Sequence, residues 1–228
     1  MKEVRLLETT QIRLFPPDVI PLMKIPIPQN GKKIQSLFDF QVLEPIEDQG
    51  IFSGISFNGG TLKGDPSAII DFVRIEGRRI AVKVHGTSDL ATSVFDAVAN
   101  ELQELNNGQQ IREIVCTHET ATSVVLSFPF DRVLSNEFVS FLNKSANNYT
   151  KNQWAENLIL PASLKFAVRY RVTDDALIKS NITLSPKALT IEPRAQSSPE
   201  EKLYWVVSPT DTDTHFKLIE DLERALSK

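Results

Sequence analysis

Hydrophobic and polar positions repeat one arrangement three times along the chain: a short β-rich run is followed by an amphipathic helical pattern. Each run has a plausible hairpin partner just upstream. The β-rich runs are Ile80–Val84, Ser123–Phe128 and Leu203–Val207, and the helical patterns after them are Ser88–Leu105, Leu134–Ser145 and Thr214–Lys228. Strands outnumber helices and most connections are short. The pattern therefore predicts an α+β fold with a mostly antiparallel sheet, built from repeated hairpin-plus-helix units with three helices packed on one face.

The first helical pattern predicts how such a helix packs. Its residues at helical spacing form an apolar stripe, which consists of Leu90, Val94, Val98 and Leu102. The preceding strand alternates in character, and its apolar members are Ile80, Val82 and Val84. Because alternate residues of a strand share a face, we expect the helix to cover the apolar side of this strand.

Four segments upstream of this helix have the apolar, β-branched content of strands: Val4–Phe15, Ile34–Leu43, Ile51–Phe57 and Ala68–Ile75. The pair Asn58-Gly59 is typical of a tight turn, because both residues tolerate positive φ. Further along, His118–Thr122 is polar and is predicted to form the turn of a second hairpin. Leu164–Val172 alternates clearly and predicts another strand.

Five prolines fall within residues 16–28. Proline fixes φ and has no backbone donor, so this segment is predicted to be an extended arm. Its apolar residues predict that it packs across a surface, either of its own domain or of a partner. The polar stretch Asn143–Asn157 is the best candidate for a boundary. It divides the chain into an N-terminal part, 1–146, and a C-terminal part, 147–228, which are either two related lobes or one continuous domain.

Composition narrows the classes of partner. The formal net charge is −4, which gives no overall attraction to nucleic acid or to an anionic membrane. No apolar run approaches the ~20 residues that a membrane helix needs. The single cysteine, Cys116, has no internal disulfide partner, and this favours a reducing, cytoplasmic location. A protein or an anionic ligand remains the expected partner; a membrane or a nucleic acid is not expected.

Motifs that carry chemistry are sparse. Asp211, Asp213 and His215 alternate in a pattern that suits a divalent metal. They also directly precede a helical pattern, where carboxylates accept hydrogen bonds from free backbone donors. We favour capping, and we predict no metal site. No dinucleotide, phosphate-loop or paired-cysteine motif is present, so no cofactor is expected.

An enzymatic alternative rests on dispersed residues. Cys116 and His118 are two positions apart in a predicted strand, so a thiol and an imidazole could share a face. His85 and His215 are the other two histidines of the chain. Nothing in the sequence marks Cys116 as a nucleophile of lowered pKa. An enzyme with a site assembled around His85, Cys116, His118 or His215 is therefore the alternative to a binding protein.

Basic residues alternate with apolar residues in two predicted strands. Arg79, Lys83 and His85 share one face of the first strand; Lys165, Arg169 and Arg171 share one face of the second. If these strands lie in one sheet, the charges form a basic face that can bind an acidic or phosphate-bearing partner. The competing interpretation is a solvated sheet face whose charges are balanced by acids elsewhere. The sequence thus favours a non-enzymatic binding or assembly protein.

Overall fold

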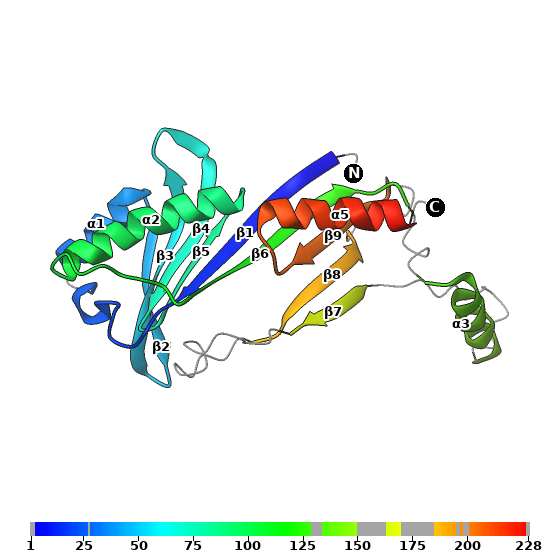
Figure 1. Cartoon of the computed structure of the whole chain (residues 1–228), viewed down its shortest axis with the longest axis horizontal. Helices are drawn as coiled ribbons and strands as arrows, with labels where there is room; N and C mark the ends of the chain where they lie inside the picture. The colour runs from blue at the N-terminus through cyan, green and yellow to red at the C-terminus, as the bar shows by residue number, and fades with distance from the viewer. Residues whose placement is uncertain are drawn as a thin grey trace.

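The described part of the chain contains one antiparallel sheet of nine strands (Figure 1). The computed structural model describes residues 3–26, 28–128, 134–149, 163–169, 185–194, 197 and 201–226. The strand order is β2-β3-β4-β5-β1-β6-β9-β8-β7. The strands are β1 (Glu3–Leu14), β2 (Val42–Asp48), β3 (Ile51–Leu62), β4 (Asp65–Glu76), β5 (Arg79–Val84), β6 (Val115–Val125), β7 (Leu164–Val168), β8 (Lys187–Pro193) and β9 (Leu203–Ser208). The predicted α+β class with an antiparallel sheet is confirmed.

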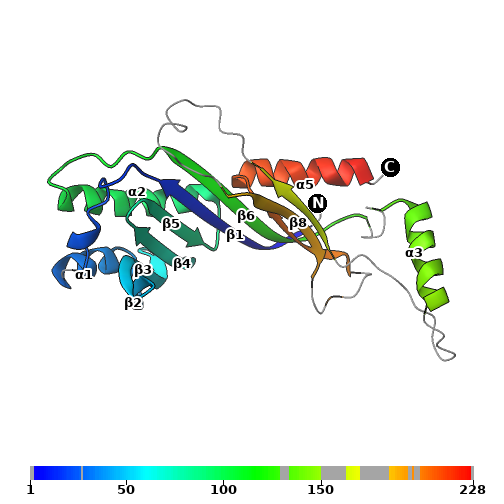
Figure 2. The same ribbon diagram turned by 90° about the horizontal axis from the view of Figure 1, so that it is seen from below.

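Two long helices pack on the same face of this sheet. The helices of the described residues are α1 (Pro28–Leu37), α2 (Ser88–Leu105), α3 (Asn136–Tyr149) and α5 (Thr212–Leu226), with a short 3-10 turn, η1 (Leu22–Lys24). Figures 1 and 2 both show α3 standing away from the sheet, whereas α1 lies beside α2. Phe138 and Phe141 of α3 are 48% and 62% exposed. The prediction of three helices on one face is therefore wrong for this one, because its apolar side does not reach the sheet.

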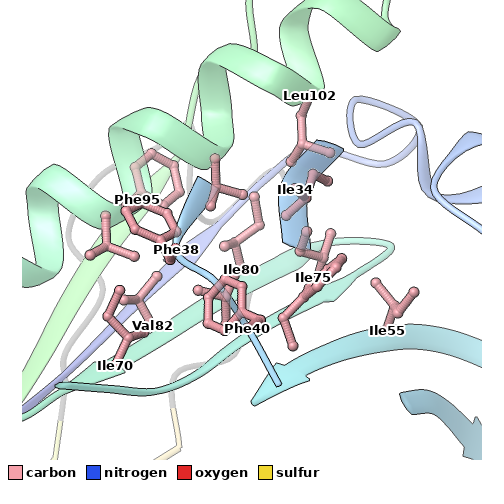
Figure 3. Packing of buried hydrophobic residues seen from close by; sticks show 14 of the residues in the cluster. Ile34, Phe38, Phe40, Ile55, Ile70, Ile75, Ile80, Val82, Phe95 and Leu102 are labelled. Carbon is pink, nitrogen blue, oxygen red and sulfur yellow. The ribbon is translucent and has the colours of Figure 1, made fainter. Parts of the chain in front are cut away.

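Helix α2 forms where the alternation of the sheet gives way to helical spacing. Thr87 caps it by accepting a hydrogen bond from the backbone N–H of Leu90. Its buried side is that of the predicted stripe and includes Val94, Val98 and Leu102, which pack with residues of β3, β4 and β5 in one hydrophobic cluster (Figure 3). A second, smaller cluster lies under α5 and includes Ile219, Val124 and Val206.

The segment predicted as a strand at Ile34–Leu43 is instead the end of α1, a loop and only the first two residues of β2. That prediction is wrong because Ile34 and Phe38 lie four residues apart, the spacing of one helix face. Both side chains are at least 95% buried in the larger cluster.

The turn predicted at Asn58-Gly59 is also wrong, because β3 continues to Leu62. Gly59 has a φ of 67°, and a Cβ on Gly60 would lie only 2.6 Å from the Phe40 ring. The glycines thus let an aromatic side chain approach the strand closely. The hairpin turn lies further on, where Gly64 has a φ of 88°.

The predicted hairpin around His118–Thr122 is a single strand, β6, which passes straight through this polar segment. β6 pairs with β1 on one side and with β9 on the other. Thr120 and Thr122 are fully buried in the middle of the sheet. Local polarity suggested a turn, but pairing on both sides satisfies the backbone and the threonine side chains find partners of their own.

The proline-rich arm packs on its own chain. Ile20 and Ile25 are buried in the larger cluster, and η1 gives the arm a helical turn that the sequence did not predict. The Lys24 ammonium donates to the carbonyl of Leu105, and the Asn106 amide donates to the carbonyl of Val19. The arm therefore covers the C-terminal end of α2.

One sheet runs through both parts of the chain that the sequence suggested as lobes. β6 lies before the predicted boundary and β9 after it, and these two strands are hydrogen-bonded neighbours. That boundary, between residues 146 and 147, falls within α3. A hairpin followed by a helix recurs as β4–β5–α2 and β8–β9–α5. Whether this recurrence reflects duplication stays a prediction.

Replacing Leu102 by Ala tests the packing of α2. Leu102 is fully buried, so the change removes apolar contacts and leaves a cavity. We expect the free energy of unfolding to fall by about 2–5 kcal/mol in chemical denaturation. Met23→Ala is the control, since that side chain is 78% exposed, and it should cost less than about 0.5 kcal/mol. Equal stability of the two variants would contradict this packing.

Candidate functional site

The strand register assigns every sheet residue to one of two faces. Residues directly opposite in an antiparallel pair lie on the same side, so Val82, Gln11 and His118 share a face, as β5, β1 and β6 are paired. This is the helix face, which α2 and α5 cover. On the open face, no helix of the described residues packs against the sheet. The open face is where the predicted basic residues of β5 project.

Acids of neighbouring strands neutralise the basic residues of β5. The Lys83 ammonium lies 3.1 Å from a carboxylate oxygen of Glu8 in β1 and 2.9 Å from one of Asp71 in β4. Partial burial opposes the charge of Lys83, but hydrogen bonds to Asp71 and Glu8 outweigh it and raise its pKa above the ordinary value. The same Asp71 carboxylate lies 2.8 Å from Nε2 of His85. Arg79 Nε donates to the carboxylate of Glu76 at 3.1 Å.

The second predicted basic strand keeps its charge exposed. Lys165 in β7 and Arg169 just beyond it are exposed, and neither is paired with a carboxylate among the residues described. Lys165 lies opposite Thr190, which lies opposite Val207. This ladder places Lys165 on the open face, the same face as Lys83. Arg171 lies outside the described residues.

The two basic strands are far apart although they share a face. Strands β1, β6, β9 and β8 separate β5 from β7. With a spacing of about 4.8 Å between neighbouring strands, β5 and β7 are roughly 24 Å apart. A twist of about 20–25° at each step turns their open faces by roughly 100° relative to one another. Arg79, Lys83 and His85 therefore do not lie beside Lys165 and Arg169.

Two arginines on the open face stack on aromatic rings, and the sequence predicted neither contact. The Arg194 guanidinium, just after β8, lies 4.9 Å from the ring centre of Trp205 in β9. Arg74 lies over Phe72 at 4.3 Å, both in β4. Arginine remains charged when it stacks on an aromatic ring. Alternation in β9 marks Trp205 as facing opposite to Val206; only the tertiary structure shows which arginine meets it.

The described surface includes two hollows of similar volume. One of about 400 Å³ lies on the open face near β2, and its lining combines Arg74 and Arg79 with Glu44, Glu47 and Glu76. The other, of about 390 Å³, lies beside the arm and η1. The three glutamates of the first hollow outnumber its two arginines, so the first hollow does not favour an anion.

Cys116 and His118 are the only members of the enzymatic alternative that the described structure brings together. Cys116 Sγ lies 3.9 Å from His118 Nε2, on the helix face of β6. The same nitrogen is 2.9 Å from the Gln11 amide nitrogen. Desolvation raises the pKa of the Cys116 thiol and lowers the pKa of His118. Both shifts favour the neutral forms, which is the opposite of an activated thiolate.

His215 is a structural residue inside a polar network. Its ring is fully buried, with Nδ1 2.7 Å from the Ser208 hydroxyl and Nε2 2.9 Å from the Thr122 hydroxyl. Desolvation lowers the pKa of His215 to about 4. His85 lies on the open face, so the three histidines do not converge.

The predicted cap of the last helix is confirmed for Asp211. Asp211 accepts hydrogen bonds from the backbone N–H and the hydroxyl of Thr214, each at 2.9 Å. These bonds hold the pKa of Asp211 below its usual value, and the bond from the backbone N–H of Thr214 has the largest effect. Asp213 lies exposed in the first turn. Among the residues that the structure describes, no group of three or more His, Cys, Asp or Glu residues gathers as metal ligands do.

Comparisons with known proteins add no assignment. No family model matches this chain, and a search of curated proteins finds no match. Within the described ranges, no helix combines the length and the apolar character needed to cross a membrane.

The low pKa of His215 predicts a loss of stability in acid. The unfolded chain takes up a proton near the ordinary pKa of 6.5, whereas the folded chain takes it up only near 4. The contribution of His215 to the free energy of unfolding is therefore fully present above about pH 6.5, and it is lost as the pH falls toward 4. Between about pH 7 and about pH 4.5 the expected loss from this residue is roughly 2–3 kcal/mol.

Urea denaturation of the native protein and of His215→Gln at both pH values measures this contribution. Gln keeps hydrogen-bonding groups but does not titrate, so the gap in stability between the two proteins should narrow in acid. A gap that stays constant between the two pH values would show that His215 is not held neutral by burial.

Proposed function

We propose that this chain is a non-enzymatic binding or assembly protein that engages an acidic partner through the basic edge of its sheet. The basic edge consists of Lys165, Arg169 and Arg194, on or beside β7 and β8. The observation that carries the proposal is that these side chains are exposed and have no carboxylate partner among the described residues. The basic residues of β5, in contrast, are already paired with acids.

The spacing of these cations favours an extended partner. Arg169 and Lys165 are four residues apart, and the register continues along β8 to Arg194. At about 3.3 Å per residue the three charges extend over roughly 26 Å. A single phosphate would meet one of them, whereas an extended acidic segment can meet all three. Edge strands bind such segments because their outer backbone groups are free to pair.

The enzymatic alternative has less support. Catalysis by Cys116 would need a thiolate, and desolvation raises the pKa of its thiol instead. Lys187, whose ammonium donates to the carbonyl of His118, also has a pKa lowered by desolvation. The pair is thus a partly covered polar contact in the middle of the sheet.

Binding of a fluorescein-labelled hexaglutamate peptide tests the proposal. Reversing two charges in Lys165→Glu/Arg169→Glu should weaken binding about tenfold or more, because attraction at exposed positions becomes repulsion. Fluorescence anisotropy measures the dissociation constant. Raising salt should weaken binding to the native protein, since exposed charges are screened within about 8–10 Å near physiological ionic strength.

Lys63→Glu/Lys217→Glu is the matched control. Both lysines are exposed and lie outside the basic edge, and the net charge changes by the same amount. This control should bind the peptide as the native protein does. Equal weakening in both double variants would mean that the peptide responds to overall charge alone, and the proposed site would be abandoned.

A further inference from the structure

The two edges of the sheet carry opposite charge. β2 forms one edge and contains Glu44, Glu47 and Asp48 but no basic residue. β7 forms the other edge of the sheet as described, and it carries Lys165 and no acid, with Arg169 directly after it. Both edges are largely exposed. An exposed edge presents unpaired backbone groups that can pair with another strand.

The faces of the two edges also match. Leu43 of β2 lies opposite Phe57, which lies opposite Val73, and this register places Leu43 on the helix face. Phe166 of β7 lies opposite Leu189 and is also on the helix face. Leu43 is 39% exposed and Phe166 is 52% exposed. Placing β7 of one copy beside β2 of another would join these apolar side chains on one side.

The same juxtaposition would bring opposite charges together on the other side. Glu44 lies opposite Ser56, which lies opposite Arg74, so Glu44 is on the open face. Lys165, opposite Thr190, is on the open face as well. One copy's lysine would then face the other copy's glutamate. Apolar contacts on the helix face and an ion pair on the open face would form in the same arrangement.

The direction of the strands fixes how the edges would pair. Every neighbouring pair in the sheet is antiparallel, so directions alternate from β2 to β7 and these two strands run the same way. Joining the edges with both helix faces on one side makes a parallel pair. Lys165 and Arg169 are four residues apart, as are Glu44 and Asp48. When Lys165 lies opposite Glu44, Arg169 lies opposite Asp48.

Pairing of identical edges is disfavoured. A two-fold contact of β2 with β2 would place carboxylates against carboxylates, and one of β7 with β7 would place Lys165 and Arg169 against themselves. Like charges directly opposite are destabilising in a sheet. The complementary contact is therefore head to tail, which produces closed rings or open filaments instead of a two-fold dimer.

We propose that the acidic partner of the basic edge is the β2 edge of a second copy of this chain, an inference that rests on the function proposed above. The nine-stranded sheets of successive copies continue one another, with β7 of one beside β2 of the next. Pro45 has no backbone N–H, so the backbone hydrogen bonds between β2 and the β7 strand of the next copy are incomplete. The side-chain pairs, Lys165 with Glu44 and Arg169 with Asp48, set the register and the specificity of the contact.

Charge reversal tests this arrangement. Two variants of the full chain are needed: one with an acidic β7 edge, Lys165→Glu/Arg169→Glu, and one with a basic β2 edge, Glu44→Lys/Asp48→Lys. Sedimentation velocity over about a hundredfold range of concentration measures self-association by mass action. The native protein should associate with rising concentration, and each variant alone should do so at least tenfold more weakly.

An equimolar mixture of the two variants provides the sharpest readout. The acidic β7 edge of the first variant complements the basic β2 edge of the second, so the mixture should regain association close to that of the native protein. Glu201→Lys/Glu220→Lys is the control for the second variant; it changes exposed acids elsewhere and should associate normally. Circular dichroism of each variant checks folding. Lys165→Gln/Arg169→Gln replaces the first variant if the acidic substitutions perturb β7. It removes the two charges without reversing them, so it should show an intermediate loss of association.

Failure of the assembly and failure of the proposed function are distinguishable. A native protein that stays monomeric, or a mixture of variants that does not associate, would overturn the head-to-tail contact. If hexaglutamate still binds the native protein and is lost in Lys165→Glu/Arg169→Glu, the basic edge keeps its function with a different acidic partner. Association that is unchanged in both variants would mean that copies meet through another surface, and would also overturn the proposal.

Discussion

The central pairing of β1 with β6 is the constraint on which the rest of the structure depends. It buries polar side chains, because Thr9, Gln11, Thr120 and Thr122 all lie on the helix face and are at least 98% buried. A buried polar group without a partner is costly. Residues that pack on the helix face of this pair must therefore supply hydrogen bonds. The Gly86 carbonyl accepts from Thr9, and the Thr92 hydroxyl accepts from Gln11. His215 is hydrogen-bonded to Thr122.

These polar partners place both helices. The backbone N–H of Ser88 donates to the Thr212 hydroxyl at 2.8 Å, so the start of α5 satisfies a free donor at the start of α2. The Thr212 backbone N–H lies 3.4 Å from the Ser88 hydroxyl in return. The two N-terminal ends therefore meet above the central strands, and each helix runs outward over its own hydrophobic cluster. Helix ends that face each other would otherwise leave donors unsatisfied.

Pairing across strands also decides which charges are available to a partner. Lys83 lies among acids that are distant in sequence, Glu8 and Asp71, because β1 and β4 flank β5. Among the strands that the structure describes, β7 pairs with β8 alone, and the positions opposite Lys165 and Phe166 are Thr190 and Leu189. An edge strand thus keeps its charge exposed where an inner strand is neutralised. The predicted basic face is divided into a neutral inner portion and a basic edge for this reason.

The sequence by itself determined the α+β class, the helix Ser88–Leu105 with its apolar stripe, and the Asp211 cap, because periodicity and capping act within a few residues. The same local information missed α1 and divided β6 at its threonines. It also could not show which acids surround Lys83, which arginine lies over Trp205, or that α3 stands off the sheet. Strand order and register decided these features, because they bring together residues whose separation in the chain carries no local signal.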